Sequence, residues 1–404
     1  MPLPKIPLIA LAPHGWHDRW LSRQQLLSRL AQRGWPVIYS PGALSIWDLQ
    51  KPVWQGAPWL SPWLNSPQAS DGVLLDQPGR LLLRRPGSPR WDGLTVGHHG
   101  RWLNKKISGS FRGEVGLILF HPLFYPYVEA LNPRFVVYHV YDLFSAMDHW
   151  TPQLAAMEAG LVARADLITT SSDGMAQGLP GIGPQKARPL YNGADGQSVV
   201  AASDSPCPED LAKIPHPRIG YVGTVNAKID LKMVHHVATT HPAWHWIFIG
   251  PVMFSESRER DRQARALWES CLRLPNVHSL GIKHRTEIPP YLHHMDLNTI
   301  CYRIADTAAG EPADWVVHGY PVKLHECLAT GKPLVAAPQT SVQNLFSHVT
   351  AIANTPAQWS QAIEHALTSG GVGTPASRIQ VALANSWDNR VDTLEKWLGE
   401  VISG

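Results

Sequence analysis

The sequence predicts a two-domain α/β protein in which each domain is built on a doubly wound parallel sheet. Short, almost continuously apolar runs alternate with amphipathic helical patterns in both halves of the 404-residue chain, as expected for strands covered on both faces. A Pro-, Ser- and Asp-rich stretch between Asp195 and Pro217 interrupts this alternation, which then begins again. With 44% hydrophobic and 17% charged residues, the chain can fill two cores.

The first half predicts five strands and two helices before the break. The strands are expected within 6–13, 36–42, 113–122, 133–142 and 166–172, and the helices within 17–34 and 151–165. Residues 50–113 interrupt the rhythm with Pro, Gly, Trp and Arg, which predicts an insertion or irregular hairpins.

The second half repeats the strand–helix pattern. Strands are expected within 218–225, 244–252, 276–282, 296–303 and 332–338, and helices within 230–241, 258–274, 287–295, 321–331 and 386–401. The predicted division is a first domain over 1–200, a linker over 201–216 and a second domain over 217–385. A C-terminal helical segment, 386–404, is expected to pack across the junction.

The composition excludes some protein classes. No apolar run approaches the roughly 20 residues that a membrane-spanning helix needs. The N-terminal stretch imitates a signal peptide, but it lacks a small-residue cleavage site and fits a first buried strand better. The chain has four scattered cysteines without metal-type spacing, which favours reduced thiols in the cytoplasm. They are Cys207, Cys271, Cys301 and Cys327.

One segment is strongly basic and rich in tryptophan. Eight basic residues and one acid lie between Arg80 and Arg112, and nine of the 17 tryptophans lie in the first 102 residues. This composition suits the inner face of the plasma membrane, with its anionic surface, or an acidic ligand. The alternative is a set of solvated loops around an ordinary core. Nucleic acid is not expected as a partner, because no recognised binding motif accompanies the charge.

Lys323 and Glu326 stand three residues apart, so they share one face of a predicted helix. A lysine near a helix N-terminus adds its charge to the helix dipole, which suits a diphosphate. A glutamate one turn later can accept hydrogen bonds from both hydroxyls of a ribose. The alternative is an exposed ion pair that contributes about 0.2–0.5 kcal/mol.

Two strand ends of the first domain carry further candidates. Asp142 follows the strand "FVVYHVY" and could act as a general base, as could His139, or Asp142 could cap the next helix. His14 and Gly15 follow the first strand, where they could lie near a phosphate or an acceptor, or simply form the turn.

At the Lys323–Glu326 helix the sequence resembles a known family. "PVKLHECLATGKPLVA" is similar to the P-x-K-x-x-E-x-L-A-x-G-K-P-V-V signature of GT-B glycosyltransferases, which use nucleotide sugars. "YHVYDLFS", "ARADLITTSS", "YNGAD" and "IGYVGTV" resemble further motifs in the family's order. The likeness covers most of the chain. It is nearest to family-4-like bacterial surface polysaccharide enzymes of the teichuronic-acid type and looser to the xanthan glucuronosyltransferase type.

The resemblance implies two Rossmann-like domains facing across a cleft, with the acceptor bound by the first and the donor mainly by the second. It implies that Lys323 holds the diphosphate, that Glu326 holds the ribose and that the backbone at Ile282 reads the base. It assigns contacts with the phosphates or the sugar to Gly223, Thr224 and Arg303. Such enzymes usually need no bound metal and no cofactor besides the donor.

The sequence also departs from the family pattern. His318 stands where retaining members have a glutamate that contacts the donor sugar, and Thr224 stands where they often have an arginine. His139 replaces the first aspartate of a usual pair, while Asp142 remains. The donor-sugar contacts and the stereochemical course therefore stay open.

The resulting expectation is a cytoplasmic, peripheral-membrane glycosyltransferase. It would move a sugar from a nucleoside diphosphate, expected to be UDP, to a glycan or lipid-linked acceptor in bacterial surface polysaccharide synthesis. The alternatives are a catalytically degenerate GT-B protein that binds a glycan or a partner, and a GT-B sugar-nucleotide epimerase.

Overall fold

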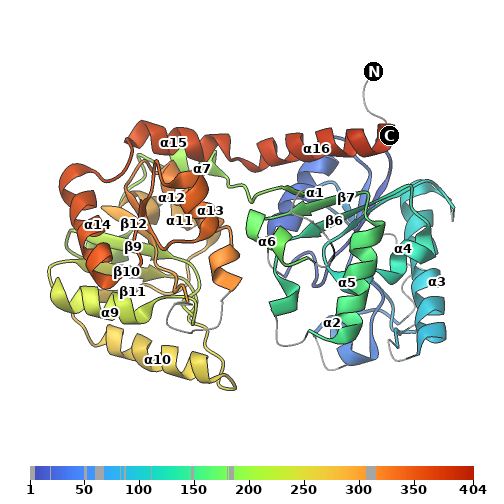
Figure 1. The fold of residues 1–404 in the computed structure, drawn as a ribbon, viewed down its shortest axis with the longest axis horizontal. Coiled ribbons are helices and arrows are strands. Elements are labelled where there is room, and N and C mark those ends of the chain that lie inside the picture. Colours follow the sequence, from blue (N-terminus) through green and yellow to red (C-terminus); the bar gives the residue numbers. More distant parts are fainter. Residues whose placement is uncertain are drawn as a thin grey trace. The chain divides into compact units, whose positions relative to one another are not determined.

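The chain folds into two compact units, Met1–Tyr191 with Arg390–Gly404, and Asn192–Asn389. Each unit has helices around a central sheet (Figure 1). The two predicted doubly wound sheets are therefore confirmed. The computed structural model describes residues 5–18, 20–49, 52–59, 68–81, 83–85, 88–110, 112–146, 150–179, 181, 186–305 and 315–404.

The sheet of the first unit has the strand order β3-β4-β2-β1-β5-β6-β7-β8. β3 pairs antiparallel with β4, and the remaining described pairings are parallel. The strands are β1 (Leu8–Leu11), β2 (Val37–Ser40), β3 (Gln68–Ser70), β4 (Val73–Leu75), β5 (Gly116–Leu119), β6 (Phe135–Val140), β7 (Leu167–Thr170) and β8 (Ala187–Pro189). The central strands are completely buried, which explains why their sequences are continuous apolar runs.

Helices of the first unit cover both faces of this sheet. They are α1 (Ser22–Gln32), α2 (Pro52–Gly56), α3 (Pro89–Ser108), α4 (Pro126–Leu131), α5 (Pro152–Arg164) and α6 (Asp173–Gln177), with the short 3₁₀ turns η1 (Ile46–Asp48), η2 (Pro122–Phe124) and η3 (Phe144–Ala146). The helix predicted over 17–34 begins later than expected, at Ser22, because Leu21 is extended and Gln24 caps its backbone N–H.

The prediction of an irregular segment over 50–113 is wrong for its second half. Residues Pro89–Ser108 form the regular 20-residue helix α3, and β4 adds a parallel strand to the sheet. Glycine and histidine hide the helical pattern in the sequence, since both are poor helix formers. Gly100 allows α3 to pack closely on α4, because a Cβ there would lie 3.2 Å from the side chain of Leu131.

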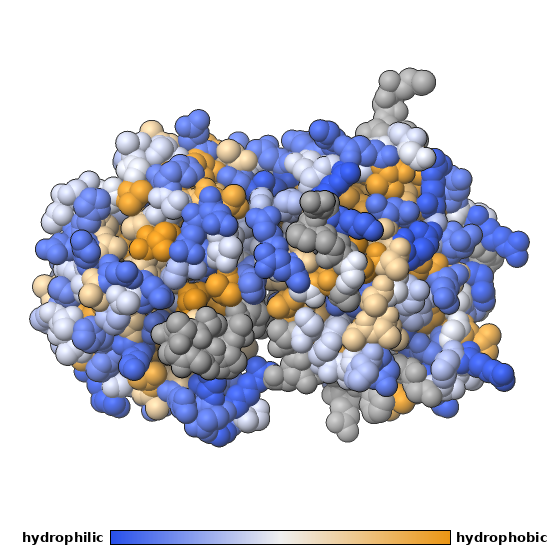
Figure 2. Space-filling view, in the orientation of Figure 1, coloured by the Kyte–Doolittle hydropathy of each residue, from blue (hydrophilic) through white to orange (hydrophobic). Residues whose placement is uncertain are grey.

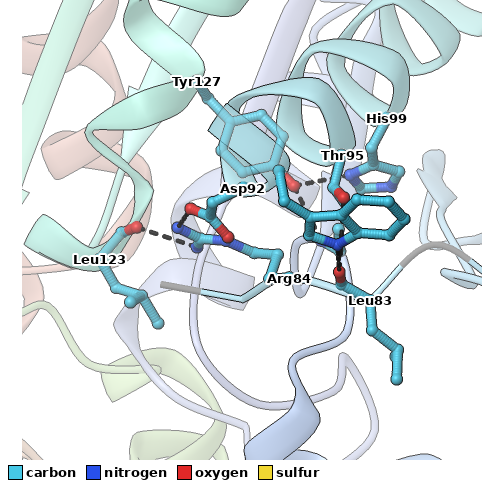
Figure 3. A network of polar contacts seen from close by, with 9 residues as sticks. Leu83, Arg84, Asp92, Thr95, His99, Leu123 and Tyr127 are labelled. Atoms are coloured by element: carbon cyan, nitrogen blue, oxygen red, sulfur yellow. Dashed lines mark hydrogen bonds and ion pairs between the residues drawn. The ribbon is translucent and has the colours of Figure 1, made fainter. Parts of the chain in front are cut away.

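Arg84 anchors the start of α3 from inside the unit (Figure 3). Its buried guanidinium donates from Nε and Nη2 to the two carboxylate oxygens of Asp92, at 3.1 and 2.8 Å, and from Nη1 to the carbonyl of Leu123 at 3.2 Å. Nearby, His99 bonds Tyr127 at 2.7 Å and Asp76 at 2.9 Å. Arg84 is therefore a structural residue, which corrects its inclusion in a solvent-facing basic surface.

The second unit has a six-stranded parallel sheet in the order β11-β10-β9-β12-β13-β14. The strands are β9 (Arg218–Val222), β10 (His245–Ile249), β11 (Val277–Ser279), β12 (Leu297–Ile300), β13 (Leu334–Ala336) and β14 (Ala351–Ile352). Alternate residues of β10 belong to different clusters: Trp246 and Phe248 pack on one face, and Ile247 and Ile249 on the other. Both faces of the sheet are thus covered.

The helices of the second unit fall into two groups, one on each face of the sheet. α9, α10 and α14 pack together on one face, and α7, α11, α12 and α15 on the other. The helices are α7 (Gly196–Ala201), α8 (Glu209–Ala212), α9 (Leu231–Thr240), α10 (Glu259–Leu272), α11 (Ile288–His293), α12 (Lys323–Ala329), α13 (Thr340–Phe346), α14 (Pro356–Ser369) and α15 (Pro375–Ala384), with the turns η4 (Arg285–Glu287) and η6 (Trp315–His318).

The units divide at Asn192, so the segment 201–216 that the sequence predicts as a linker lies inside the second unit. It contains α8, where Asp210 accepts hydrogen bonds from Lys283 at 2.6 Å and from Tyr291 at 2.7 Å. The long C-terminal helix α16 (Trp387–Ser403) contributes its residues from Arg390 onward to the first unit.

Among the described residues, no helix combines the length and the apolar character needed to cross a bilayer. The face of the molecule drawn in Figure 2 is largely hydrophilic, with hydrophobic residues in scattered patches. The four cysteines are free thiols, and three of them are buried.

Candidate functional site

A cavity of about 430 Å³ lies in the second unit, and every residue that lines it belongs to that unit. Its walls come from residues at or after the carboxyl ends of β9, β12 and β13, and from α7, η4, α11 and α12. Carboxyl ends of parallel strands are the usual ligand edge of a doubly wound sheet. Three of the predicted site residues, Gly223, Lys323 and Glu326, line this cavity together.

Lys323 opens α12 and is held by aromatic rings. Its Nζ lies 4.0 Å from the ring centroid of Tyr221 and 5.4 Å from that of Tyr302. Burial opposes the charge, but the two phenol groups raise the pKa of Lys323 above its usual value, so the side chain is cationic at neutral pH. Among the described residues, no carboxylate lies within ion-pair distance of this ammonium group, so its charge is available to a ligand.

Gly223 makes room for this lysine. It has a φ of 140°, a conformation that residues with a side chain rarely adopt, and a Cβ at this position would collide with Nζ of Lys323. The glycine that the sequence places after β9 is thus required by its backbone conformation, and a side chain there would displace the ammonium group beside it.

Glu326 lies one turn further along α12 and faces the same cavity. Burial raises the pKa of its carboxyl group, whereas the positive charges of Arg285 and Lys323 act in the opposite direction. Among the described side chains, none donates a hydrogen bond to this carboxylate. Two hydroxyl donors from a ligand would therefore offset the desolvation of its charge.

Gln339 is a cavity residue that the sequence did not reveal. It is buried, and its Nε2 donates to the carbonyl of Val316 at 2.9 Å, while its Oε1 has no partner among the described residues. The hydroxyl of Ser341 donates to the carbonyl of Gly319 at 2.8 Å. These two bonds fix the segment before α12, and no described residue pairs with the remaining buried amide oxygen.

Other lining residues were also missed. They include Asp195, Lys228, Arg285, Tyr302 and Tyr320. The sequence holds one signal for Arg285, because it closely follows the strand end at which Ile282 was singled out. The remaining four stand in loops or short helices whose return to the same edge depends on the tertiary fold.

Four predicted donor-site residues are outside the cavity lining. Ile282 is 73% exposed at the end of β11. The carbonyl of Thr224 accepts a hydrogen bond from the hydroxyl of Tyr221 at 3.1 Å. The backbone N–H of Arg303 donates to the carbonyl of Lys228 at 2.7 Å. His318 ends η6.

The candidates of the first unit occupy two environments. His139 is 2% exposed, its Nδ1 bonds Thr169 at 2.8 Å, and burial lowers its pKa to about 4. It is therefore an enclosed, neutral side chain. Asp142 is partly exposed, and its Oδ1 accepts the N–H of Leu143 at 3.1 Å before the turn η3.

The loop after β1 is closed by its own side chains. His14 is exposed with a φ of 78°, and its carbonyl accepts the hydroxyl of Tyr39 at 2.9 Å. The N–H of Gly15 donates to the carboxylate of Asp18 at 2.7 Å. That carboxylate occupies the place where an external anion could approach the N–H of Gly15.

Among the described residues, no group of three or more His, Cys, Asp or Glu side chains is arranged to hold a metal ion.

Comparisons with known proteins agree with this architecture. No model of a known protein family matches the chain. Over 253 residues it is 26% identical to a protein of Bacillus subtilis (strain 168) that is provisionally assigned as the teichuronic acid biosynthesis glycosyltransferase TuaH. The match covers 61% of this chain and 60% of that protein, so the chain matches less than two thirds of its relative's length.

Solved structures resemble the whole chain. HepE of Anabaena, in complex with UDP and glucose, has a TM-score of 0.67 at 14% identity and matches over 97% of this chain and 99% of its own. The sucrose-phosphate synthase of Thermosynechococcus elongatus has a TM-score of 0.68 at 13% identity, over 98% and 99%. The chain therefore has the GT-B fold of these glycosyltransferases, and its resemblance to the teichuronic-acid type is confirmed.

Proposed function

We propose that this chain is a glycosyltransferase that moves a sugar from a UDP-sugar to a glycan or lipid-linked acceptor in bacterial surface polysaccharide synthesis. The observation that carries the proposal is the ammonium group of Lys323, which has no carboxylate partner among the described residues and lies beside two tyrosine rings at a cavity that Glu326 also lines. A cation and a carboxylate one helical turn apart match the diphosphate and the ribose of a nucleotide sugar.

The comparisons support the choice of donor and of pathway. Structures of HepE, which has the same fold, contain UDP or UDP-glucose. The relative TuaH bears the name of a teichuronic acid biosynthesis enzyme, which supports an acceptor that belongs to a cell-surface glycan.

In the proposed reaction each residue has a defined task. Lys323 holds the diphosphate and offsets the negative charge that grows on it as the bond to the anomeric carbon breaks. Glu326 holds the ribose hydroxyls and fixes the donor along α12. An acceptor hydroxyl forms the new bond to the anomeric carbon, its proton passes to Asp142, and UDP leaves. His139 is not assigned this proton, because it is enclosed and its pKa is low.

The test combines donor binding with turnover. A thermal-shift panel over UDP-, GDP-, dTDP- and ADP-sugars is expected to select the UDP-sugars, since a ligand at a hundredfold excess over Kd stabilises by about 2.7 kcal/mol. Release of UDP in the presence of a cell-envelope extract is then expected. Binding without release would favour a glycan- or partner-binding protein, and conversion of the free UDP-sugar would favour an epimerase.

We also propose that α3 faces an anionic membrane surface in the cytoplasm. Arg90, Leu94, Arg101 and Lys105 are exposed and fall on one side of this helix, and Leu94 is 70% exposed. Each basic residue near such a surface contributes about 1 kcal/mol, screened over a Debye length of about 8 Å at physiological salt.

Replacing the three basic residues of this face by serine is expected to reduce cosedimentation with anionic vesicles at low salt. Lys232→Ser, at an exposed lysine on α9, serves as a control for the loss of charge elsewhere. Equal cosedimentation of the triple variant and the parent protein would refute the membrane face.

A further inference from the structure

We propose that the first unit binds an anionic group of the acceptor, a phosphate or a carboxylate, through the guanidinium group of Arg23. That the ligand is an acceptor rests on the proposed function; the anion site itself is argued from the first unit alone. It would define the chemical class of the acceptor.

Arg23 is a buried cation that has no counter-ion among the residues that the structure describes. Arg23 is only 1% exposed, and within the described part of the chain its Nε and Nη2 have no hydrogen-bond partner. Its positive charge acts on the hydroxyl of Tyr39, which donates to the carbonyl of His14 at 2.9 Å. Among the described residues, no carboxylate lies within ion-pair distance. A buried charge in such surroundings is costly until an anion pairs with it.

The remaining buried arginines of the described chain show how unusual this is. Arg84 is paired with both oxygens of Asp92. Arg218 donates to the carbonyls of its own unit, and Arg378 does the same through all of its nitrogen atoms. Arg23 alone in this group keeps two guanidinium nitrogens unpaired. The described residues around Arg23 therefore give its charge no structural role.

The position of Arg23 fits a ligand site. It lies in the first turn of α1, just after the loop that follows β1, and its guanidinium carbon is 6.0 Å from the ring centroid of Tyr141. Tyr39 pairs in register with Ala10 of β1, and Tyr141 directly follows β6. The guanidinium thus lies at the carboxyl edge of the parallel sheet, beside the positive end of an 11-residue helix.

The nearest acid of the loop does not neutralise this charge. Asp18 accepts the N–H of Gly15 and forms no ion pair with Arg23. Asp142, the proposed base, is the residue after Tyr141, over whose ring the guanidinium lies. An acceptor anchored to Arg23 by its anionic group would therefore hold its hydroxyl groups in the neighbourhood of Asp142.

The experiment uses the full chain saturated with UDP, so that phosphate cannot act through the cavity of the second unit. Inorganic phosphate and glucuronate are titrated by calorimetry and thermal shift into the parent protein, Arg23→Met and Arg29→Met. Arg29 lies on the same helix but is partly exposed and already donates to Gln25, so it is the matched control.

The parent protein and Arg29→Met are expected to bind at least one of the two anions. Arg23→Met should bind it roughly tenfold to hundredfold more weakly, as expected for a lost charge-assisted hydrogen bond. Without anion, Arg23→Met should melt no lower than the parent protein, because it no longer buries an unpaired charge. Equal anion affinity in Arg23→Met and the parent protein, or no response of the parent protein to either anion, would overturn the proposal.

Two further arms complete the design. If Arg23→Met does not fold, Arg23→Lys keeps the charge and should retain part of the response; a folded lysine variant without any response would count against the site. Vesicles with phosphatidic acid, compared with phosphatidylcholine alone, distinguish a lipid phosphate from a soluble anionic glycan. UDP binding should be unchanged in all these variants, whereas failure of the parent protein to bind UDP would refute the donor site instead.

Discussion

The cavity of the second unit and the sheet edge of the first differ in how their polar groups are satisfied. In the cavity, Lys323 is held by aromatic rings and Glu326 has no described hydrogen-bond donor, so both keep their capacity for a ligand. At the edge of the first unit, His139 is bonded to Thr169, and the N–H of Gly15 is bonded to Asp18. Most polar groups at the edge of the first unit are thus satisfied within the protein, and Arg23 is the exception, since two of its guanidinium nitrogens have no hydrogen-bond partner among the described residues.

This difference indicates where substitutions should affect function and where they should affect stability. Changes at Lys323 are expected to act on donor affinity, and changes at His139 on the fold. Asp142 could act in either way, in function or in stability, because it is partly exposed and its carboxylate also accepts the backbone N–H of Leu143.

The largest effect is expected for Asp142→Asn. A positioned base contributes about 10²–10⁴-fold, so turnover should fall by that factor while UDP affinity stays unchanged. Asparagine preserves most of the capping ability, so the melting temperature should change little. Lost stability with normal specific activity would show that Asp142 only caps η3. Normal turnover and stability would assign the proton to another group or show that the reaction needs no base.

The next largest effect is expected for the stability of the protein at acidic pH, through His139. Because burial lowers its pKa from 6.5 to about 4, the unfolded chain binds this proton more readily than the native protein between those values. Stability should therefore be full above pH 6.5 and fall by about 2–4 kcal/mol as the pH drops to 4. In His139→Gln this part of the decline should disappear in denaturant titrations across that range. An unchanged pH profile in the variant would show that His139 is not the titrating group.

Lys323→Ala should weaken UDP binding by about 1.5–3 kcal/mol, the contribution of a charge-assisted hydrogen bond. Lys232→Ala, at an exposed lysine of α9, is the control, and calorimetry is the measurement. Both variants should unfold at the same denaturant concentration as the parent protein, within error. Unchanged UDP affinity in Lys323→Ala would remove the phosphate role from this residue and leave the cavity without its principal cation.

The smallest effect is expected at Tyr302. Tyr302→Phe keeps the ring beside Lys323 and should bind UDP normally, whereas Tyr302→Leu removes it and should lose about 0.5–2 kcal/mol of UDP affinity. Equal affinities for the two variants would show that Tyr221 alone holds the lysine. A loss in both would indicate that the hydroxyl of Tyr302, and not its ring, matters.

The alternation of apolar runs with helical patterns was sufficient to predict the two sheets, since strands buried on both faces must be apolar throughout. It was insufficient for α3, in which Gly100 packs closely against α4 and His99 bonds Tyr127 of α4, because these contacts join segments that are distant in sequence. The sequence pattern also did not show that the segment 201–216 belongs to the second unit. The reason is related, because α8 is held by Lys283 and Tyr291, which are distant in sequence.

By itself, the sequence determined the fold class and the local motif that places Lys323 and Glu326 on one face of α12, because helical spacing is a property of neighbours in the chain. Only the tertiary structure decided that Tyr221 and Tyr302 lie beside the lysine and that Gln339 buries an amide oxygen without a partner among the described residues. It also decided that Arg84 is paired with Asp92, whereas no described carboxylate pairs with Arg23. Burial and pairing depend on residues brought together from distant parts of the chain, and no spacing in the sequence records them.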